Sequence, residues 1–159
     1  MLTKVDEAIT IFQKALAVDP QFPIPSAQLA QNFHKIGKID QATAYYRRLV
    51  GMVQFAEVLG VLGTLYLIQQ EYEKSIDYLH QALRLEPNSS KLNQNSLAAH
   101  HQWGMKLIEN QDYSQAITKF QQGLERFSQS KILLCDLAMA HELLTDYAAA
   151  QKIYEEILD

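Results

Sequence analysis

The sequence predicts an all-α fold, a stack of short antiparallel helix hairpins. Three observations support this prediction. Glycine and proline are scarce among the 159 residues, with 6 and 4 copies, and few stretches alternate apolar and polar residues as strands do. A small residue flanked by large apolar ones recurs about every 34 residues. Short polar segments separate the helical stretches.

The small residue marks the second helix of each hairpin. Large apolar residues stand three positions before it and four after it, so the three side chains share one helical face. A small side chain there lets a neighbouring helix approach closely. The small residues are Ala8, Ala42, Ser75, Ala116 and Ala150, at spacings of 34, 33, 41 and 34 residues. The residues three before are Val5, Ile39, Tyr72, Tyr113 and Tyr147, and those four after are Phe12, Tyr46, Leu79, Phe120 and Tyr154.

A second small residue, twelve positions before each of the last four, predicts the first helix of the hairpin. These residues are Ala30, Gly63, Gly104 and Ala138, preceded by Leu29, Leu62, Trp103 and Leu137. The turns between the two helices are too short for anything but an antiparallel pair. They are Gly37-Lys38, Gln70-Glu71, Gln111-Asp112 and Thr145-Asp146. Proline ends two of the hairpins, at Asp19-Pro20 and Glu86-Pro87.

These residues resemble the tetratricopeptide repeat, whose pattern runs from a Trp-or-Leu/Gly pair through Tyr, Ala, an aromatic residue and Ala to Pro. The copy over 56–89 fits best, with mild departures at Ser75 and Leu79. Its matching residues are Leu62-Gly63, Tyr66, Tyr72, Ala82 and Pro87. In the next copy Gly123 and Ser128 replace the family's later Ala and Pro.

The resemblance implies a right-handed superhelical solenoid of antiparallel helix hairpins, with about nine helices. It covers nearly the whole chain, so we expect a single domain over 1–159. The expected parts are a partial repeat 1–22, repeats 23–55, 56–89 and 97–130, and an incomplete repeat 131–159.

The 41-residue spacing holds seven extra residues, close to two helical turns. We interpret residues 90–110 as one lengthened first helix, because Leu92, Ala99 and Trp103 keep roughly one stripe. A looped insertion over 88–96 is the alternative, favoured by the polar run at 93–96.

The ends of the chain interrupt the repeat. The chain begins with only a second helix, at about 3–18, and ends before any helix that would cover the last repeat. Uncovered apolar surface is therefore expected at Ile11, Phe12, Ile153 and Ile157. Two interpretations stay open: the chain is a piece of a longer polypeptide, or its ends pair with another copy in a homo-oligomer.

Composition argues against several classes of function. The 14 basic and 18 acidic side chains give a net charge of -4, without the basic excess of a nucleic-acid-binding surface. A single cysteine, Cys135, allows no intrachain disulfide and fits a reducing compartment, and we expect a cytoplasmic protein. Neither a signal peptide nor an apolar run long enough to insert in a membrane is evident.

No residue pattern indicates catalysis, a cofactor or a metal. The five histidines are His34, His80, His100, His101 and His141. His100 and His101 are adjacent and point about 100° apart on a helix, so they cannot easily share an ion. His141 occupies an internal position of the repeat and is expected to be packed, and Cys135 is expected to behave as a small buried hydrophobe. We therefore predict no catalytic, cofactor-binding or metal-binding residues.

A partner-binding surface is predicted along the first helices, which line a concave groove in proteins of this family. Aligning the repeats gives four rows of equivalent residues. The rows are Ala27, Gly60, His101 and Cys135; Gln31, Thr64, Met105 and Met139; His34, Leu67, Ile108 and Glu142; and the flanking row Gln28, Val61, Gln102 and Asp136. The predicted contacts are Gln31, His34, Thr64, Leu67, His101, Met105, Ile108, Met139 and Glu142.

The chemistry of these rows favours an apolar or amphipathic peptide or helix of a partner protein. Family members that grip a terminal carboxylate place lysine, arginine and asparagine in such rows, and none occurs here. Helical spacing alone cannot separate groove residues from residues buried between repeats, so that alternative stays open.

Three functions follow from these observations. The first is a protein-protein interaction scaffold or adaptor that performs no catalysis. The second is the repeat segment of a larger modular enzyme, such as a glycosyl- or other group transferase with its catalytic residues elsewhere. The third is a self-associating structural module.

Overall fold

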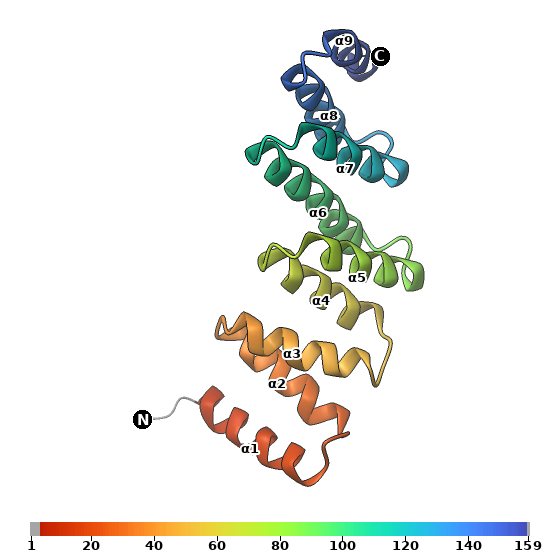
Figure 1. Ribbon diagram of the computed structural model, residues 1–159. Coiled ribbons are helices and arrows are strands. Elements are labelled where there is room, and N and C mark those ends of the chain that lie inside the picture. The colour runs from red at the N-terminus through yellow and green to blue at the C-terminus, as the bar shows by residue number, and fades with distance from the viewer. Residues whose placement is uncertain (1–3, 159) are drawn as a thin grey trace. The chain divides into compact units, whose positions relative to one another are not determined.

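The computed structural model describes residues 4–158, and over these residues the chain forms nine helices and no strand (Figure 1). The all-α repeat fold predicted from the sequence is confirmed. The helices are α1 (Lys4–Val18), α2 (Pro23–Lys35), α3 (Ile39–Val50), α4 (Ala56–Ile68), α5 (Tyr72–Leu85), α6 (Ser90–Glu109), α7 (Tyr113–Arg126), α8 (Lys131–Leu143) and α9 (Tyr147–Leu158).

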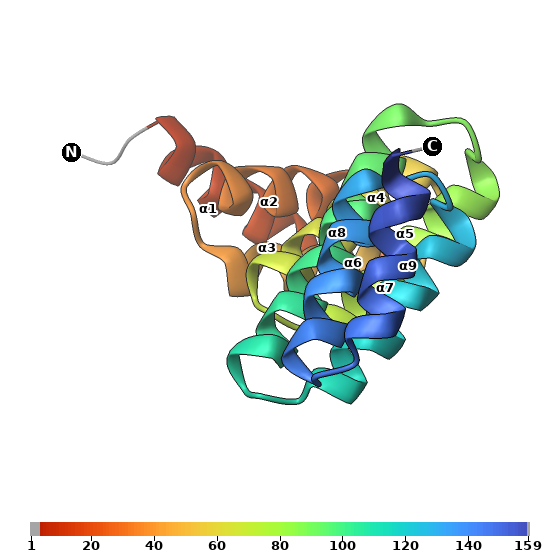
Figure 2. The same cartoon turned by 90° about the horizontal axis from the view of Figure 1, so that it is seen from above.

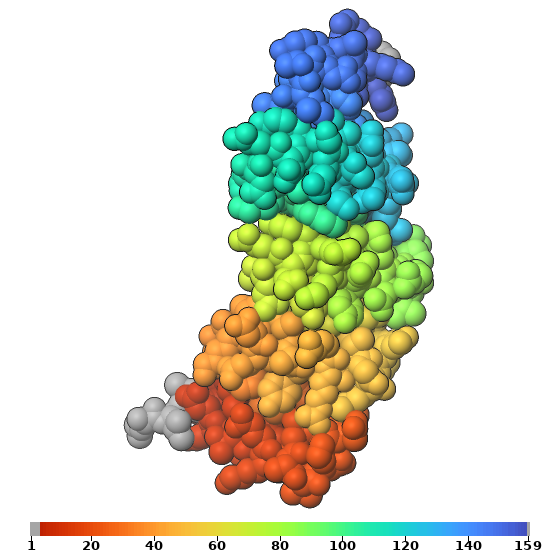
Figure 3. All heavy atoms as spheres, in the orientation of Figure 1, coloured from red at the N-terminus to blue at the C-terminus, as the bar shows by residue number. Residues whose placement is uncertain are grey.

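The helices belong to two compact units, Met1–Leu92 and Asn93–Asp159, whose boundary falls inside α6. Each unit is built from hairpins whose two helices lie side by side, as Figure 2 shows for α8 and α9. In Figure 3, which draws all heavy atoms, no gap separates α4 from α5. The expectation of one domain over 1–159 stays a prediction.

The 41-residue spacing between Ser75 and Ala116 arises from a longer first helix, α6. Helix α6 has 20 residues, whereas α2, α4 and α8 have 13 each. The seven additional residues make about two turns, so the later part of α6 keeps the helical phase of the other first helices. The alternative of a looped insertion over 88–96 is wrong.

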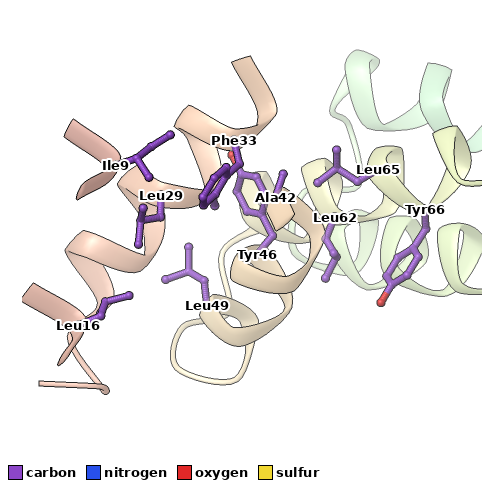
Figure 4. Packing of buried hydrophobic residues seen from close by; sticks show 11 residues of the cluster. Ile9, Leu16, Leu29, Phe33, Ala42, Tyr46, Leu49, Leu62, Leu65 and Tyr66 are labelled. Carbon is purple, nitrogen blue, oxygen red and sulfur yellow. The ribbon is translucent and has the colours of Figure 1, made fainter. Parts of the chain in front are cut away.

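The small residues of the repeat lie at the centre of each hairpin. Ala42, Ser75 and Ala116 are 0% exposed and Ala150 is 2% exposed. In the first unit, Leu29 and Phe33 of α2 point toward Tyr46 and Leu49 of α3 (Figure 4). In the second unit one core cluster is formed by Ala116, Phe120, Leu133, Leu137 and Ala140.

Two glycines set the distance between the helices of their hairpins. A Cβ on Gly63 of α4 would lie 2.7 Å from Leu79 Cγ of α5 and 3.1 Å from the Ser75 carbonyl oxygen. A Cβ on Gly104 of α6 would overlap three atoms of the Phe120 ring of α7. The large residue of the second helix therefore fills the space that the missing side chain leaves.

The turns inside the hairpins share one backbone conformation. Gly37, Gln70, Gln111 and Thr145 have φ of 72°, 59°, 65° and 62°. The following amide in each turn donates to the carbonyl five residues earlier, as Lys38 does to Phe33 at 2.9 Å and Asp146 to His141 at 2.9 Å. This is the Schellman arrangement that ends a helix through a left-handed residue. Only one of the four turns uses glycine for it.

The first and last helices carry exposed apolar side chains. Ile11 is 64% exposed, while Phe12, Ile153 and Ile157 are half-buried. Tyr147 and Leu158 of α9 are 66% and 86% exposed, whereas the residues equivalent to Leu158 in α1 and α5, Leu16 and Leu83, are buried. Self-association through these faces stays a prediction.

The interlock of α6 and α7 can be tested at Gly104. Gly104→Ala should lower the free energy of unfolding by about 1–3 kcal/mol, because the added methyl group overlaps the fully buried Phe120 ring. Urea denaturation followed by circular dichroism measures the change. Phe120→Leu removes ring atoms, so in the double variant the two losses should combine to less than their sum by about 1 kcal/mol. Additive losses would contradict the interlock.

The turn at Thr145 can be improved. A β-branched residue in the left-handed region costs about 1–2 kcal/mol. Thr145→Gly should therefore raise the unfolding temperature by about 2–4 °C in a calorimetric scan. Thr118 lies exposed within α7, where Thr118→Gly should instead cost about 0.5 kcal/mol. If Thr145→Gly destabilised the protein as much as Thr118→Gly does, the left-handed backbone at Thr145 would not be costly.

Candidate partner-binding surface

The predicted contacts of the second unit lie on α6 and α8. His101, Met105 and Ile108 follow one face of α6, at steps of four and three residues, and Met139 and Glu142 share a face of α8. Glu142 is exposed, and the other four side chains are half-buried. The stripe therefore presents partly accessible apolar side chains with polar groups beside them.

A short hydrogen bond connects the two helices at this surface. His101 Nδ1 lies 2.6 Å from Asp136 Oδ2, and the Asp136 side chain is 11% exposed against 39% for His101. The sequence placed both residues in adjacent rows but did not pair them. The spacing could have indicated the pair, because the two residues lie 35 positions apart, one more than the 34-residue repeat. That separation places them at adjacent row positions of neighbouring first helices.

Two residues of the stripe also belong to the interior. Met105 and Ile108 pack against the core cluster of the second unit, which contains Phe120 and Leu137. Their remaining exposed surface is what a partner could contact. Part of each side chain is therefore buried against the core, as the packing alternative expects, and part is exposed.

In the first unit the predicted contacts divide by burial. Gln31 and His34 of α2 are exposed, and Thr64 and Leu67 of α4 are half-buried. The Thr64 hydroxyl donates to the Gly60 carbonyl oxygen at 2.9 Å, so it is used within its own helix. Among the predicted contacts of this unit, Gln31 and His34 are therefore the most accessible.

The row that contains Gly60 faces the next first helix rather than open solvent. Gly60 is buried, and a Cβ there would overlap the Leu92 side chain at the start of α6. His101 occupies the same row and bonds to Asp136 of the next first helix. These two positions are occupied by contacts between neighbouring repeats.

The last member of that row, Cys135, corrects one expectation. Cys135 is exposed and is not a buried hydrophobe, since its position faces no following first helix within the described residues. His141, expected to be packed, is half-buried and lies 3.1 Å from Asp146 Oδ2 through Nδ1.

Glu142 interacts with the last helix. Partial burial raises the pKa of the Tyr154 phenol on α9, and the negative charge of Glu142 raises it further. The phenol is therefore protonated at neutral pH and can donate a hydrogen bond to the carboxylate. Glu142 consequently lies at the edge of the surface, next to α9.

Residues 4–158 hold neither a cluster of metal ligands nor a membrane-spanning helix. No three His, Cys, Asp or Glu side chains there are grouped closely enough to hold a metal ion. None of the described helices combines the length and the apolarity that crossing a bilayer requires. The predictions about cofactors, metals and a cytoplasmic location stay predictions.

Comparison with known proteins adds to this geometry. Two tetratricopeptide repeat family models match the sequence, one over residues 56–89 and the other over residues 101–159. Together they cover more than half of the chain, the first match within the first unit and the second within the second unit. The chain belongs to the tetratricopeptide repeat family. This membership supports a general role as a protein-interaction scaffold.

Solved structures show the same fold at low sequence identity. A MamA protein is 21% identical, with a TM-score of 0.57, and the match covers 97% of this chain and 81% of that one. The pilF protein of Pseudomonas aeruginosa is 21% identical, with a TM-score of 0.53 and coverage of 97% and 68%. A tetratricopeptide repeat protein from Parabacteroides merdae is 17% identical, with a TM-score of 0.58 and coverage of 98% and 58%.

No curated protein matches the sequence significantly. The solved structures therefore establish the tetratricopeptide repeat fold of this chain, and its partner is a matter for proposal.

Packing explains one departure of this chain from the family pattern. Gly123 stands where the tetratricopeptide repeat has its later Ala. A Cβ there would lie 2.7 Å from Leu133 Cδ1 of α8 and 3.0 Å from His100 Cβ of α6. The buried His100 of the lengthened helix thus takes the space that the usual methyl group would need.

The bond between His101 and Asp136 can be measured by a double-mutant cycle. With His101→Ala and Asp136→Ala, we expect a coupling of about 1 kcal/mol in urea denaturation, because the acceptor is largely buried. His141 and Asp146 form a matched pair with a 51% exposed carboxylate, and their coupling should stay at a few tenths of a kcal/mol, roughly. If the coupling energy of His101 and Asp136 is no larger than that of His141 and Asp146, the hydrogen bond does not stabilise the packing of α8 against α6.

Proposed function

We propose that this chain is a scaffold that binds an apolar or amphipathic peptide or helix of a partner protein along its first helices. The observation that carries the proposal is the stripe of half-buried Met105, Ile108 and Met139 on α6 and α8. In this role the chain performs no catalysis and acts by positioning its partner.

The side chains of the stripe suit such a partner. Methionine is unbranched and polarizable, so it adapts to apolar groups of different shape. Met105 and Ile108 are anchored in the core on one side, which limits the conformational entropy that binding would cost. An apolar side chain from the partner would remove their remaining exposed surface from water.

Polar groups beside the stripe would set the orientation of the partner. His101 is held by Asp136 at 2.6 Å, so its ring has a fixed direction while 39% of its side chain stays exposed. Glu142 bounds the stripe on α8. On the first unit, exposed Gln31 and His34 would supply further hydrogen bonds beside half-buried Leu67.

The test is to place charge in the stripe. Met139→Glu, alone and combined with Met105→Glu, should weaken partner binding at least about tenfold, because a carboxylate would replace an apolar contact. Proteins captured from a lysate by the parent chain would be identified by mass spectrometry. Binding of the purified partner would then be measured by calorimetry.

The matched control places the same charges elsewhere. Gln121 and Gln122 are exposed on α7, so Gln121→Glu with Gln122→Glu adds two carboxylates away from the stripe. This variant should bind like the parent chain. Circular dichroism must show the parent's helix content in every variant. Unchanged binding by a folded Met139→Glu variant would refute the proposal, and loss of folding in the single variant would favour the packing alternative.

A further inference from the structure

A polar hollow lies in the first unit and is lined by residues other than those of the stripe on α6 and α8. It has a volume of about 300 Å³, at the lower end of the range of ligand pockets. Helix α3, the end of α4 and the start of α5 surround it. Its lining consists of Asp40, Thr43, Ala44, Arg47, Tyr66, Gln69, Glu71 and Lys74. Thr43, Ala44 and Arg47 of α3 lie three, four and seven positions after Asp40, so the four residues form one continuous wall.

One rim of the hollow is fixed by hydrogen bonds. The Gln69 side-chain oxygen accepts from Thr43 Oγ1 at 3.2 Å, and Gln69 Nε2 donates to Asp40 Oδ1 at 2.7 Å. These bonds have opposite sense, so they fix which way the amide points. The second hydrogen of Nε2 has no acceptor among residues 4–158 and can serve a ligand oxygen.

Two cations also line the hollow. Lys74 Nζ lies 2.9 Å from Glu71 Oε2 and 5.5 Å from the centre of the Tyr66 ring. Arg47 lines the same hollow, is exposed, and makes no ion pair or hydrogen bond with the part of the chain that the structure describes. The pKa of Lys74 is raised first by its hydrogen bond to Glu71, and the positive charge of Arg47 acts against that rise. Two positive charges that line one hollow repel each other, and an anion between them would relieve that repulsion.

The charges also restrict the kind of anion. Glu71 already neutralises Lys74, and Asp40 places a second carboxylate at the far end, two helical turns from Arg47. One negative charge beside Arg47 balances that guanidinium. A second negative charge would face Asp40 and Glu71 with no further cation to offset it. A singly charged carboxylate therefore fits better than a phosphate dianion.

We propose that this hollow binds an acidic side chain of a partner peptide, with Arg47 as its bidentate partner and Lys74 and the Gln69 amide as further donors. A guanidinium presents two parallel N–H groups that match the two oxygens of a carboxylate. Ala44 leaves room beside Arg47 because its side chain ends at Cβ. The hollow is a second contact site, and none of its residues belongs to the first-helix stripe.

The experiment is a titration of the full ¹⁵N-labelled chain, followed by proton-nitrogen correlation spectra at low, constant ionic strength. The probe is the blocked peptide acetyl-Gly-Glu-Gly-amide, and its matched control is acetyl-Gly-Gln-Gly-amide. The glutamate probe should give saturable shifts at the Arg47 side chain, the Gln69 amide and the backbone amides of 69–74. The glutamine probe should bind about tenfold more weakly, since it lacks the charge.

Two matched variants locate the binding. Arg47→Gln should weaken the glutamate probe about tenfold, while Arg84→Gln on exposed α5 surface outside the hollow should leave it unchanged. Arg47→Lys keeps the charge without the paired donors, so it should give an intermediate affinity. Added salt should weaken binding in the parent chain.

Several results would overturn the proposal. These are shifts that do not saturate, equal responses to the two peptides, or parent-like binding by Arg47→Gln. Inorganic phosphate producing the same shifts at equal or lower concentration would also overturn it, because the carboxylate preference would then be absent. The stripe on α6 and α8 is untouched in every variant, so partner capture through that stripe and binding in the hollow succeed or fail separately.

Discussion

The structure depends on one packing relation, in which a small residue on the first helix of a hairpin receives a large residue from the second helix. Gly104 and the Phe120 ring show it most clearly, since even one methyl group on Gly104 would overlap the ring. Gly63 and Leu79 repeat it in the first unit. Close approach buries both faces with few voids, which is how helices of 12 to 14 residues, too short to be stable alone, hold together.

This relation also fixes which residues remain for function. Once the interlocking faces are buried, each first helix keeps a strip that either contacts the next first helix or stays partly open. Gly60 contacts Leu92, and His101 bonds to Asp136, so these residues contact the next first helix. Met139 and part of Met105 stay partly open to solvent. The hollow beside Arg47 lies among polar side chains of α3, the end of α4 and the start of α5.

Much of the fold was readable from local pattern. The helices and their pairing followed from the spacing of small and large residues, because each hairpin closes over a short stretch of chain. The lengthened α6 followed from counting seven residues against the helical turn. The left-handed turns at Gln70, Gln111 and Thr145 did not, since these residue types do not demand that conformation and the closing hairpin imposes it.

The candidate site was predicted less completely. Sequence spacing assigned Met105, Ile108 and Met139 to one surface, but how far each is buried depends on neighbouring helices far along the chain. The same dependence made Cys135 exposed rather than packed and brought Asp136 to His101. Arg47, Gln69 and Lys74 gave no motif at all, because they meet only when three helices are assembled.

The sequence by itself thus determined the helix hairpins, their period and the family, since these rest on contacts between residues close in the chain. Tertiary structure alone decided which polar side chains pair, which apolar ones stay open and where a hollow forms. Those outcomes depend on distances between different hairpins, and such distances are set by packing rather than by the spacing of residues along one helix.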